Sequence, residues 1–193
     1  MINFIKSKIE ASVNLKNALL SNTEILNAVS NTVNEIVTCY KNGGKVLWCG
    51  NGGSAADAQH MAAELSGRFY YDRPPLFSEA LHVNTSYITA VANDYSYDII
   101  YSRLVEAMGK KGDVLIGLST SGNSGNVIKA LEKANAMGII TVAFTGETGG
   151  KINGLSKYLI NIPSTDTPRI QECHMLLGHT ICELVEMNLF PKK

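Results

Sequence analysis

Apolar residues recur at every third or fourth position at the start of the chain. This helical period covers residues 2–20 and returns at residues 25–37, after the cap-like stretch Asn22-Thr23-Glu24. We therefore expect two amphipathic helices, the second of which ends at the helix-breaking stretch Asn42-Gly43-Gly44. The strand–helix repeat that follows contains no element that pairs with these two helices, which favours packing of the helices against another copy of the chain.

The remaining chain alternates short apolar runs with helical patterns. Runs typical of buried strands are KVLWCG, DVLIGLST, IITVAFTG and YLINIP, and helical patterns follow at residues 54–65, at NVIKALEKANAMG and at residues 169–188. In the segment 74–111, ALHVN is a further strand candidate, whereas TSYITAVAND and IIYSRLVEAMG have helical patterns. This alternation predicts right-handed crossovers and a parallel sheet covered by helices on both faces.

Length and charge limit the partners of such a fold. The 193 residues suit one domain, which we divide into a helical pair (1–42) used in oligomerisation and an α/β core (43–193). The 17 basic and 17 acidic residues cancel, which disfavours direct binding to nucleic acid or to an anionic membrane. No apolar run approaches the roughly 20 residues that span a bilayer. Because the charges cancel, any anionic ligand must be bound by a few local groups and not by a broad positive surface.

The four cysteines indicate the compartment. Cys39, Cys49, Cys173 and Cys182 form no CxxC pair and lie in apolar segments. This pattern is more typical of reduced, buried thiols in a cytoplasmic protein than of a disulfide framework.

Two glycine-rich turns follow predicted strands and open predicted helices. They are Asn51-Gly52-Gly53-Ser54 and residues 119–124, the second of which has four hydroxyls in six residues and no lysine. Free N–H groups at a helix start suit an anion, and Gly122 permits close backbone approach. Neither turn matches a dinucleotide or nucleoside-triphosphate motif, so a small phosphorylated compound is the predicted ligand. The alternative is that these residues only form turns and caps.

His60 and Glu64 are one helical turn apart, a spacing that can supply two ligands to a divalent metal or form an ordinary surface pair. On the last helix, Gln171 and His179 are about 80° apart around the axis, whereas His174 and His179 are about 140° apart. These two histidines are therefore not expected to take part in the same site. The apolar neighbours of His179 predict either a neutral site residue or a core histidine.

Four motifs in order, CGNGGSAADAQHMAAELSGRF, VANDYS, GDVLIGLSTSGNSGNVIKAL and PRIQECHMLLGHTICELV, resemble the phosphoheptose isomerases of the sugar isomerase (SIS) fold. The resemblance covers essentially the whole chain. It implies a flavodoxin-like parallel sheet in a three-layer αβα sandwich, with two additional N-terminal helices. It also implies a homotetramer with active sites at subunit interfaces and one zinc ion per subunit.

The resemblance also assigns residues to roles. It implies zinc ligands at His60, Glu64, Gln171 and His179. It implies sugar-phosphate contacts at Asn51, Gly52, Gly53, Glu64, Asn93, Asp94, Ser119, Thr120, Ser121, Ser124 and Gln171, with the serine-rich turn on the phosphate. Pro168 departs from the pattern, because some members carry an acidic residue there.

The implied reaction converts sedoheptulose 7-phosphate to the aldoheptose phosphate through an enediol, on the route to ADP-heptose and lipopolysaccharide. By resemblance, Glu64 moves the proton between the two carbons and His179 serves the oxygens. Because a zinc-bound carboxylate is a weaker base, Glu64 is predicted either to shift between the metal and the substrate or to be held only loosely by the metal. A non-catalytic SIS protein that binds the replication initiator is the alternative, although such proteins lack the pair corresponding to Glu64 and His179. A pentose or amino-sugar phosphate isomerase is a third reading.

Overall fold

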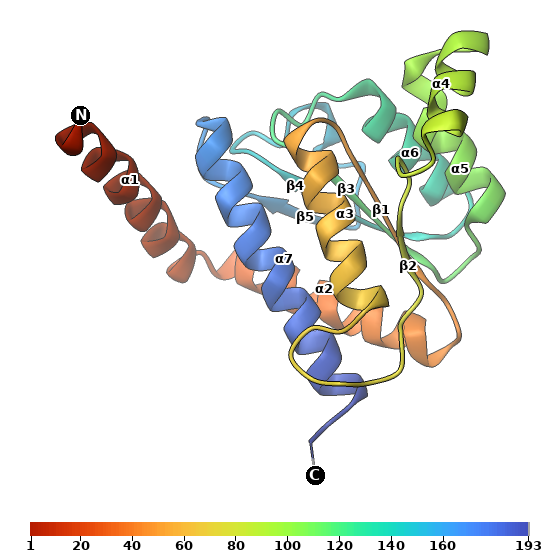
Figure 1. The fold of residues 1–193 in the computed structure, drawn as a ribbon, viewed down its shortest axis with the longest axis horizontal. Coiled ribbons are helices and arrows are strands. Elements are labelled where there is room, and N and C mark those ends of the chain that lie inside the picture. Colours follow the sequence, from red (N-terminus) through yellow and green to blue (C-terminus); the bar gives the residue numbers. More distant parts are fainter. Residues whose placement is uncertain (193) are drawn as a thin grey trace.

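The computed structural model describes residues 1–192, in which one parallel sheet lies between two layers of helices (Figure 1). The strands are β1 (Val46–Gly50), β2 (Ser78–Ala80), β3 (Val114–Ser119), β4 (Ile140–Thr145) and β5 (Tyr158–Asn161). The α-helices are α1 (Ile2–Leu20), α2 (Thr23–Lys41), α3 (Gly53–Ser66), α4 (Thr85–Asp94), α5 (Ile100–Met108), α6 (Gly125–Ala136) and α7 (Thr167–Leu189). The strand order β2-β1-β3-β4-β5 is the flavodoxin-like order, which confirms the predicted sandwich.

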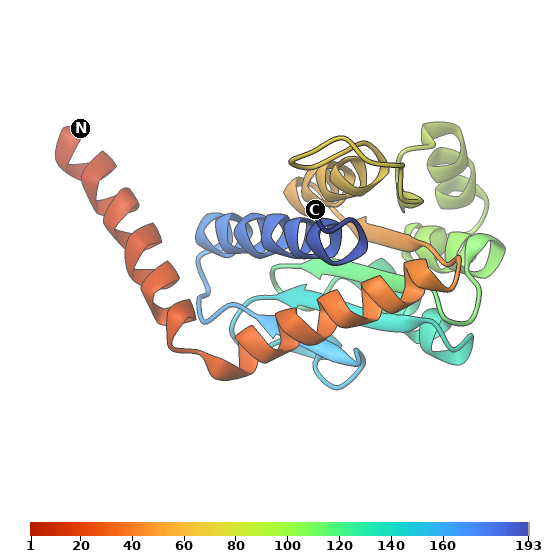
Figure 2. The ribbon, with the colours of Figure 1, turned by 90° about the horizontal axis from the view of Figure 1, so that it is seen from below.

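The sheet is buried on both faces because its strands alternate their side chains between two cores. Trp48 and its neighbours on that face pack against α2, α3 and α7. Leu47 and Cys49 point to the other face, where α4, α5 and α6 cover the sheet (Figure 2). Both faces are apolar, so the strands form continuous hydrophobic runs as parallel strands do.

The edge strand is the one element whose prediction was partly wrong. The ALHVN segment was the strand candidate, but β2 ends at Ala80, and the chain turns immediately afterwards. Three residues are too few to show an alternating pattern. Contacts with β1 fix the strand instead: the Trp48 Nε1–H donates to the Ser78 hydroxyl at 2.9 Å, and the Leu81 N–H donates to the Trp48 carbonyl at 2.8 Å.

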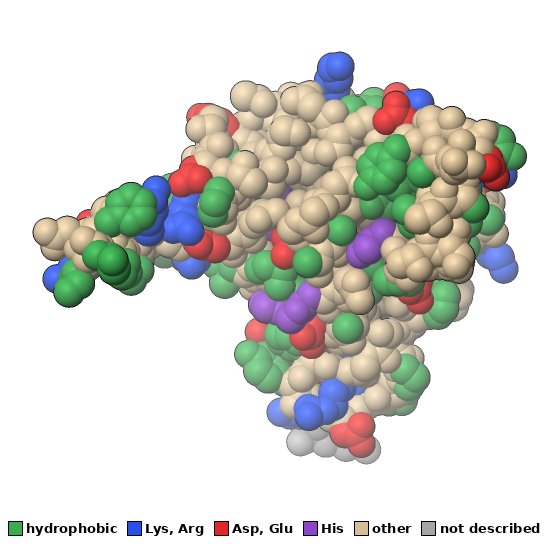
Figure 3. Space-filling model, turned by 45° about the horizontal axis from the view of Figure 1, so that its top comes forward, with side chains coloured by type: hydrophobic (Ala, Val, Ile, Leu, Met, Phe, Trp, Pro, Cys, Tyr) green, Lys and Arg blue, Asp and Glu red, His purple; other side chains and the backbone are tan. Residues whose placement is uncertain are grey.

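The two N-terminal helices have different environments. Helix α2 packs on the sheet and buries Ile25, Val29 and Ile36. Helix α1 projects from the body, and most of its apolar side chains are exposed (Figure 3). At least half of the surface is exposed for Ile2, Phe4, Ile5, Ile9 and Val13. Interfaces between copies of one chain are typically built from such apolar surface, so α1 is the part of the pair that fits the predicted oligomer contact.

All four cysteines are free and buried, as the sequence predicts. Burial raises the pKa of Cys49 to about 12, so this thiol remains protonated and unreactive. Among the described residues, no helix combines the length and the apolar character needed to cross a membrane.

His174 is the core histidine of α7, with 1% of its surface exposed. Its Nε2 lies 3.1 Å from the Thr145 carbonyl, and its ring meets the Phe144 ring edge-on. Burial lowers the pKa of His174 to about 4, while the bond to Thr145 acts in the opposite direction. An unfolded histidine has a pKa of about 6.5, so between these values the unfolded chain binds one proton more than the folded chain.

We expect His174 to make the protein less stable as the pH falls from about 6.5 towards 4, by about 3 kcal/mol in total. Urea unfolding at several pH values in this interval measures the effect. His174→Gln, which keeps an N–H donor but does not titrate, should remove this part of the pH dependence. His82→Gln is the control, because His82 is only half-buried and should contribute less. An unchanged pH dependence in His174→Gln would contradict the assignment.

Candidate functional site

The two glycine-rich turns meet at the edge of the sheet where ligands of this fold bind. They follow β1 and β3, which are adjacent strands although β2 lies between them in sequence. The connections leave these two strands in opposite directions along the sheet, and this divergence opens a crevice at their carboxyl ends. The fold therefore brings the two predicted anion-binding turns to one place.

The turn after β3 is closed by its own hydroxyls and by a glycine. The Ser119 and Ser124 hydroxyl oxygens lie 2.9 Å apart, and the Gly122 N–H donates to the Ser119 carbonyl at 2.9 Å. Gly122 has φ +66°, and a side chain there would collide with the Gly149 backbone. The turn therefore leads into α6 with hydroxyls and N–H groups gathered around the helix start, where an anion is favoured.

The turn after β1 is held by residues that the sequence analysis missed. The Asn51 and Asn126 side-chain amides exchange two hydrogen bonds, at 2.8 and 2.9 Å. These bonds satisfy the Asn126 amide, whose residue is buried with 2% of its surface exposed. The Tyr97 hydroxyl donates to the Asn51 side-chain oxygen Oδ1 at 3.1 Å, and the Tyr101 hydroxyl donates to the Gly50 backbone carbonyl at 2.5 Å. Asn126 lies in the helical pattern after the second turn, and only the pairing of β1 with β3 brings it to Asn51.

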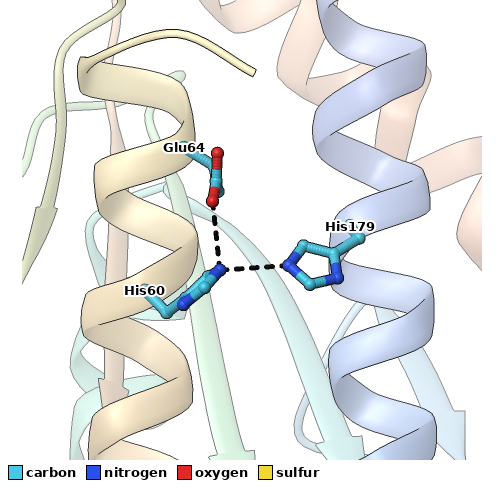
Figure 4. A group of neighbouring side chains, drawn as sticks. All are labelled: His60, Glu64 and His179. Carbon is cyan, nitrogen blue, oxygen red and sulfur yellow. Dashed lines mark hydrogen bonds and ion pairs between the residues drawn. The ribbon is translucent and has the colours of Figure 1, made fainter. Parts of the chain in front are cut away.

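A second cluster lies between α3 and α7. His60 and Glu64 project from α3 towards His179 on α7 (Figure 4). The His60 Nε2 lies 3.0 Å from the Glu64 Oε1 and 3.0 Å from the His179 Nε2. The two helices approach closely because Gly178 has no side chain: a Cβ there would lie 2.6 Å from the Met61 sulfur. The predicted spacing on α3 thus finds its third member on α7.

These three side chains fit a divalent metal. One ligand atom from each lies within 4.8 Å of the others, and the set comprises two imidazoles and a carboxylate. This is the composition of catalytic zinc sites, where two ligands at about 2.1 Å from a tetrahedral ion lie about 3.4 Å apart. The 3.0 Å separations are close to that value. His60 keeps 48% of its side chain exposed, so an ion can reach the cluster from solvent.

The two histidines of α7 separate as their angular spacing predicts, since His179 joins the cluster and His174 the core. The expectation that His179 has apolar surroundings was wrong, because the buried histidine of α7 is His174. His179 is partly exposed and has the Phe69 ring 5.8 Å from its own. Near the cluster, burial raises the pKa of Asp57, and the proximity of His60 opposes that shift.

Gln171 does not join the cluster within one chain. Its amide lies against the start of α3, where a Cβ added to Gly53 would be 2.5 Å from the Gln171 Nε2. His60 follows Gly53 by seven residues, which is about 10 Å of helix rise. Of the four zinc ligands that the resemblance implies, one chain therefore brings together His60, Glu64 and His179, and it places Gln171 at the glycine-rich turns.

Most of the other predicted sugar-phosphate residues lie at the carboxyl ends of β1 and β3. Asn51, Gly52 and Gly53 follow β1, and the residues at 119–124 follow β3. Asn93 and Asp94 are exposed at the end of α4, where the Asn93 amide donates to the Asp94 carboxylate at 2.9 Å. Pro168 stands in the first turn of α7, near Gln171. Only Glu64 lies at a distance, in the last turn of α3.

Together, a flavodoxin-like sheet, two glycine-rich turns at its switch point and a two-histidine, one-carboxylate cluster place the chain among the doubly wound α/β proteins with a ligand site at the carboxyl ends of the strands. The family described as SIS domain matches residues 12–146. The phosphoheptose isomerase of Aneurinibacillus thermoaerophilus is 51% identical over 193 residues, which cover 100% of this chain and 98% of that protein.

Solved structures agree with this result. A phosphoheptose isomerase from Neisseria gonorrhoeae has a TM-score of 0.89 at 40% identity, with 95% of this chain and 97% of that chain covered. One from Francisella tularensis has a TM-score of 0.91 at 34% identity, covering 96% and 98%. The chain belongs to the SIS-domain family and, within it, to the phosphoheptose isomerases.

Proposed function

We propose that this protein converts sedoheptulose 7-phosphate to D-glycero-D-manno-heptose 7-phosphate, a step towards ADP-heptose and lipopolysaccharide. The observation that carries the proposal is the convergence of Glu64 and His179 beside His60 in a chain that belongs to the phosphoheptose isomerases. A base and a second acid–base group are what an aldose–ketose isomerisation requires.

In this mechanism, the Glu64 carboxylate removes a proton from C1 of the ketose and returns it to C2. His179 moves a proton between the two oxygens as the carbonyl shifts from C2 to C1. A zinc ion, one per subunit, would be held by His60, Glu64 and His179 and would supply positive charge beside the negative charge that develops on the sugar oxygens. The serine-rich turn binds the phosphate, and this remote binding energy orients the reacting end.

The two parts of the site lie too far apart in one chain to serve one substrate. Glu64 follows Gly53 by eleven residues, which is about 16 Å of helix rise. An extended heptose phosphate spans roughly 9 Å from its carbonyl carbon to phosphorus, counting five C–C bonds of about 1.5 Å and the ester link. We therefore assign the phosphate turns to one copy of the chain and the His60–Glu64–His179 cluster to a neighbour, in a homotetramer.

This arrangement gives Gln171 a place in the metal site. Gln171 lies beside Gly53, at the phosphate end of its own chain, and so faces the cluster of the neighbouring copy when both bind one sugar. From there it can contact the substrate and complete four ligands around the ion. The exposed apolar side chains of α1 provide surface for the subunit contact.

A non-catalytic, initiator-binding protein is the less favoured function. Such a protein has no use for a clustered base and imidazole, and both are present here. The balanced charge of the chain offers no broad positive field for DNA. The buried, reduced thiols fit a cytoplasmic enzyme, and this location stays a prediction.

Metal removal tests the reaction and the cofactor together. We expect the zinc-loaded protein to form the aldoheptose phosphate from sedoheptulose 7-phosphate. Dialysis against a chelator should lower turnover at least about 100-fold, because the enediolate loses its positive partner, and added Zn²⁺ should restore it. Product is measured by NMR of the sugar phosphates, with a chelator-treated and reloaded sample as the control. Absence of product in every sample, together with a complex with the replication initiator, would support the alternative function.

A further inference from the structure

A buried arginine–glutamate pair closes the end of α3 next to the cluster. The Arg73 Nε donates to the Glu186 Oε1 at 3.0 Å, and 1% and 0% of the two side chains are exposed. The Glu186 carboxylate also accepts the N–H groups of Phe69 at 3.0 Å and Tyr70 at 2.8 Å. Burial opposes ionisation, but these N–H groups and Arg73 hold the pKa of Glu186 below its usual value.

The arginine caps the helix that carries Glu64. The last carbonyls of a helix lack donors within the helix. Arg73 supplies them: its Nη2 donates to the Glu64 carbonyl at 2.9 Å, and its Nη1 donates to the Leu65 carbonyl at 2.8 Å and the Gly67 carbonyl at 3.1 Å. The backbone of Glu64 is thus bonded directly to a side chain that is anchored on α7.

The glutamate belongs to the helix that carries His179. Glu186 follows His179 by seven residues, which places it two turns further along nearly the same face of α7. It holds the backbone of Phe69, whose ring lies 5.8 Å from the His179 ring. One buried carboxylate therefore connects α7 to the α3 terminus and to the aromatic neighbour of His179.

We propose that Arg73 and Glu186 are positioning residues that set the separation and orientation of Glu64 and His179 for proton transfer. The proposal rests on the isomerase function proposed above. Neither residue touches the reacting atoms; both act through the α3 terminus and Phe69. Catalytic groups misplaced by about 1 Å can lose roughly 100-fold in rate, so the pair should affect turnover more than substrate binding.

Stability alone is a poor explanation for an ionic pair at this position. Replacing a buried pair by apolar residues of similar volume is often neutral or stabilising, whereas removing one partner leaves an uncompensated charge. The doubly substituted Arg73→Met/Glu186→Leu protein should therefore fold, yet it lacks the hydrogen bonds to Glu64, Leu65 and Phe69. This variant separates positioning from folding, which single substitutions such as Glu186→Gln cannot do if they unfold the chain.

The test combines kinetics with the NMR signals of the histidine rings. The chain has four histidines, so ¹³C-histidine labelling gives few signals: His60 and His179 report on the cluster, and His82 and His174 are internal controls. In Arg73→Met/Glu186→Leu we expect kcat to fall roughly 10- to 100-fold with KM nearly unchanged. The His60 and His179 signals should shift, and those of His82 and His174 should stay in place.

The matched control is Asp113→Asn, which breaks a second, largely buried ion pair. Lys45 and Asp113 lie 2.6 Å apart at the amino ends of β1 and β3, with side chains 14% and 3% exposed. This variant should lower stability without changing kcat or the cluster signals. A folded double variant with wild-type kcat and unshifted His60 and His179 signals would overturn the positioning role. If the wild-type protein itself were inactive, the isomerase function would fail, and the histidine signals would still decide whether the pair orders the cluster.

Discussion

Replacing Glu64 by glutamine is expected to lower kcat about 10³-fold, because the amide cannot accept the proton from the sugar carbon. Glutamine keeps the size of the side chain, and Glu64 stands in the last turn of α3, with 24% of its side chain exposed, so the fold should tolerate the change. In the proposed mechanism, the phosphate is bound elsewhere, at the serine-rich turn. Binding of sedoheptulose 7-phosphate, measured by calorimetry, should therefore be largely preserved.

The matched control for this prediction is Glu132→Gln, an exposed carboxylate on α6, which should leave turnover unchanged. Product formation is followed by NMR with excess enzyme, so that a 10³-fold decrease remains measurable. Turnover of Glu64→Gln within about tenfold of the wild type would contradict the role of Glu64 as the base.

Mixing two inactive variants is expected to restore activity, because in the proposed arrangement one active site takes its parts from two copies of the chain. Glu64→Gln lacks the proposed base, and Ser121→Asp places a negative charge in the turn proposed to bind the phosphate. Ser121 is exposed, so this substitution should not disturb the core. In mixed oligomers with equal amounts of both chains, about a quarter of the sites combine an intact turn with an intact cluster. The recovered turnover should approach that fraction of the wild-type value.

A second mixture serves as the control. Glu64→Gln and His179→Asn both damage the cluster, whose three members come from a single chain. No combination of these chains has an intact cluster, so mixing them should restore nothing. Subunit exchange is verified by native mass spectrometry of differently labelled chains. Mixed oligomers of the first pair that stay inactive would show that each site belongs to one chain.

The sequence predicted the central elements well because each has a strong local signal. The runs at β1 and β3 are apolar and are followed by glycine-rich turns, so strand, turn and helix start are all marked. The i, i+4 spacing of His60 and Glu64 placed both on one face of α3, and the angular spacing on α7 separated His174 from His179. Period and composition are enough for these conclusions.

Other features had no local signal. The edge strand β2 has three residues and is defined by bonds to β1. Asn126 and Asn51 are 75 residues apart in sequence and meet across two strands. Arg73 and Glu186 are separated by 113 residues and look like ordinary surface charges in the sequence, yet both are buried.

The sequence by itself determined the alternating α/β order, the two glycine-rich turns and the helical face that holds His60 and Glu64. These follow from short-range periodicity and from the backbone freedom of glycine, which a single segment carries. Only the tertiary structure decided that His179 joins this face, that Gln171 lies near Gly53 instead, and that Arg73 and Glu186 fix the end of α3. Such contacts depend on how α3 and α7 pack side by side, and packing is set by the whole core.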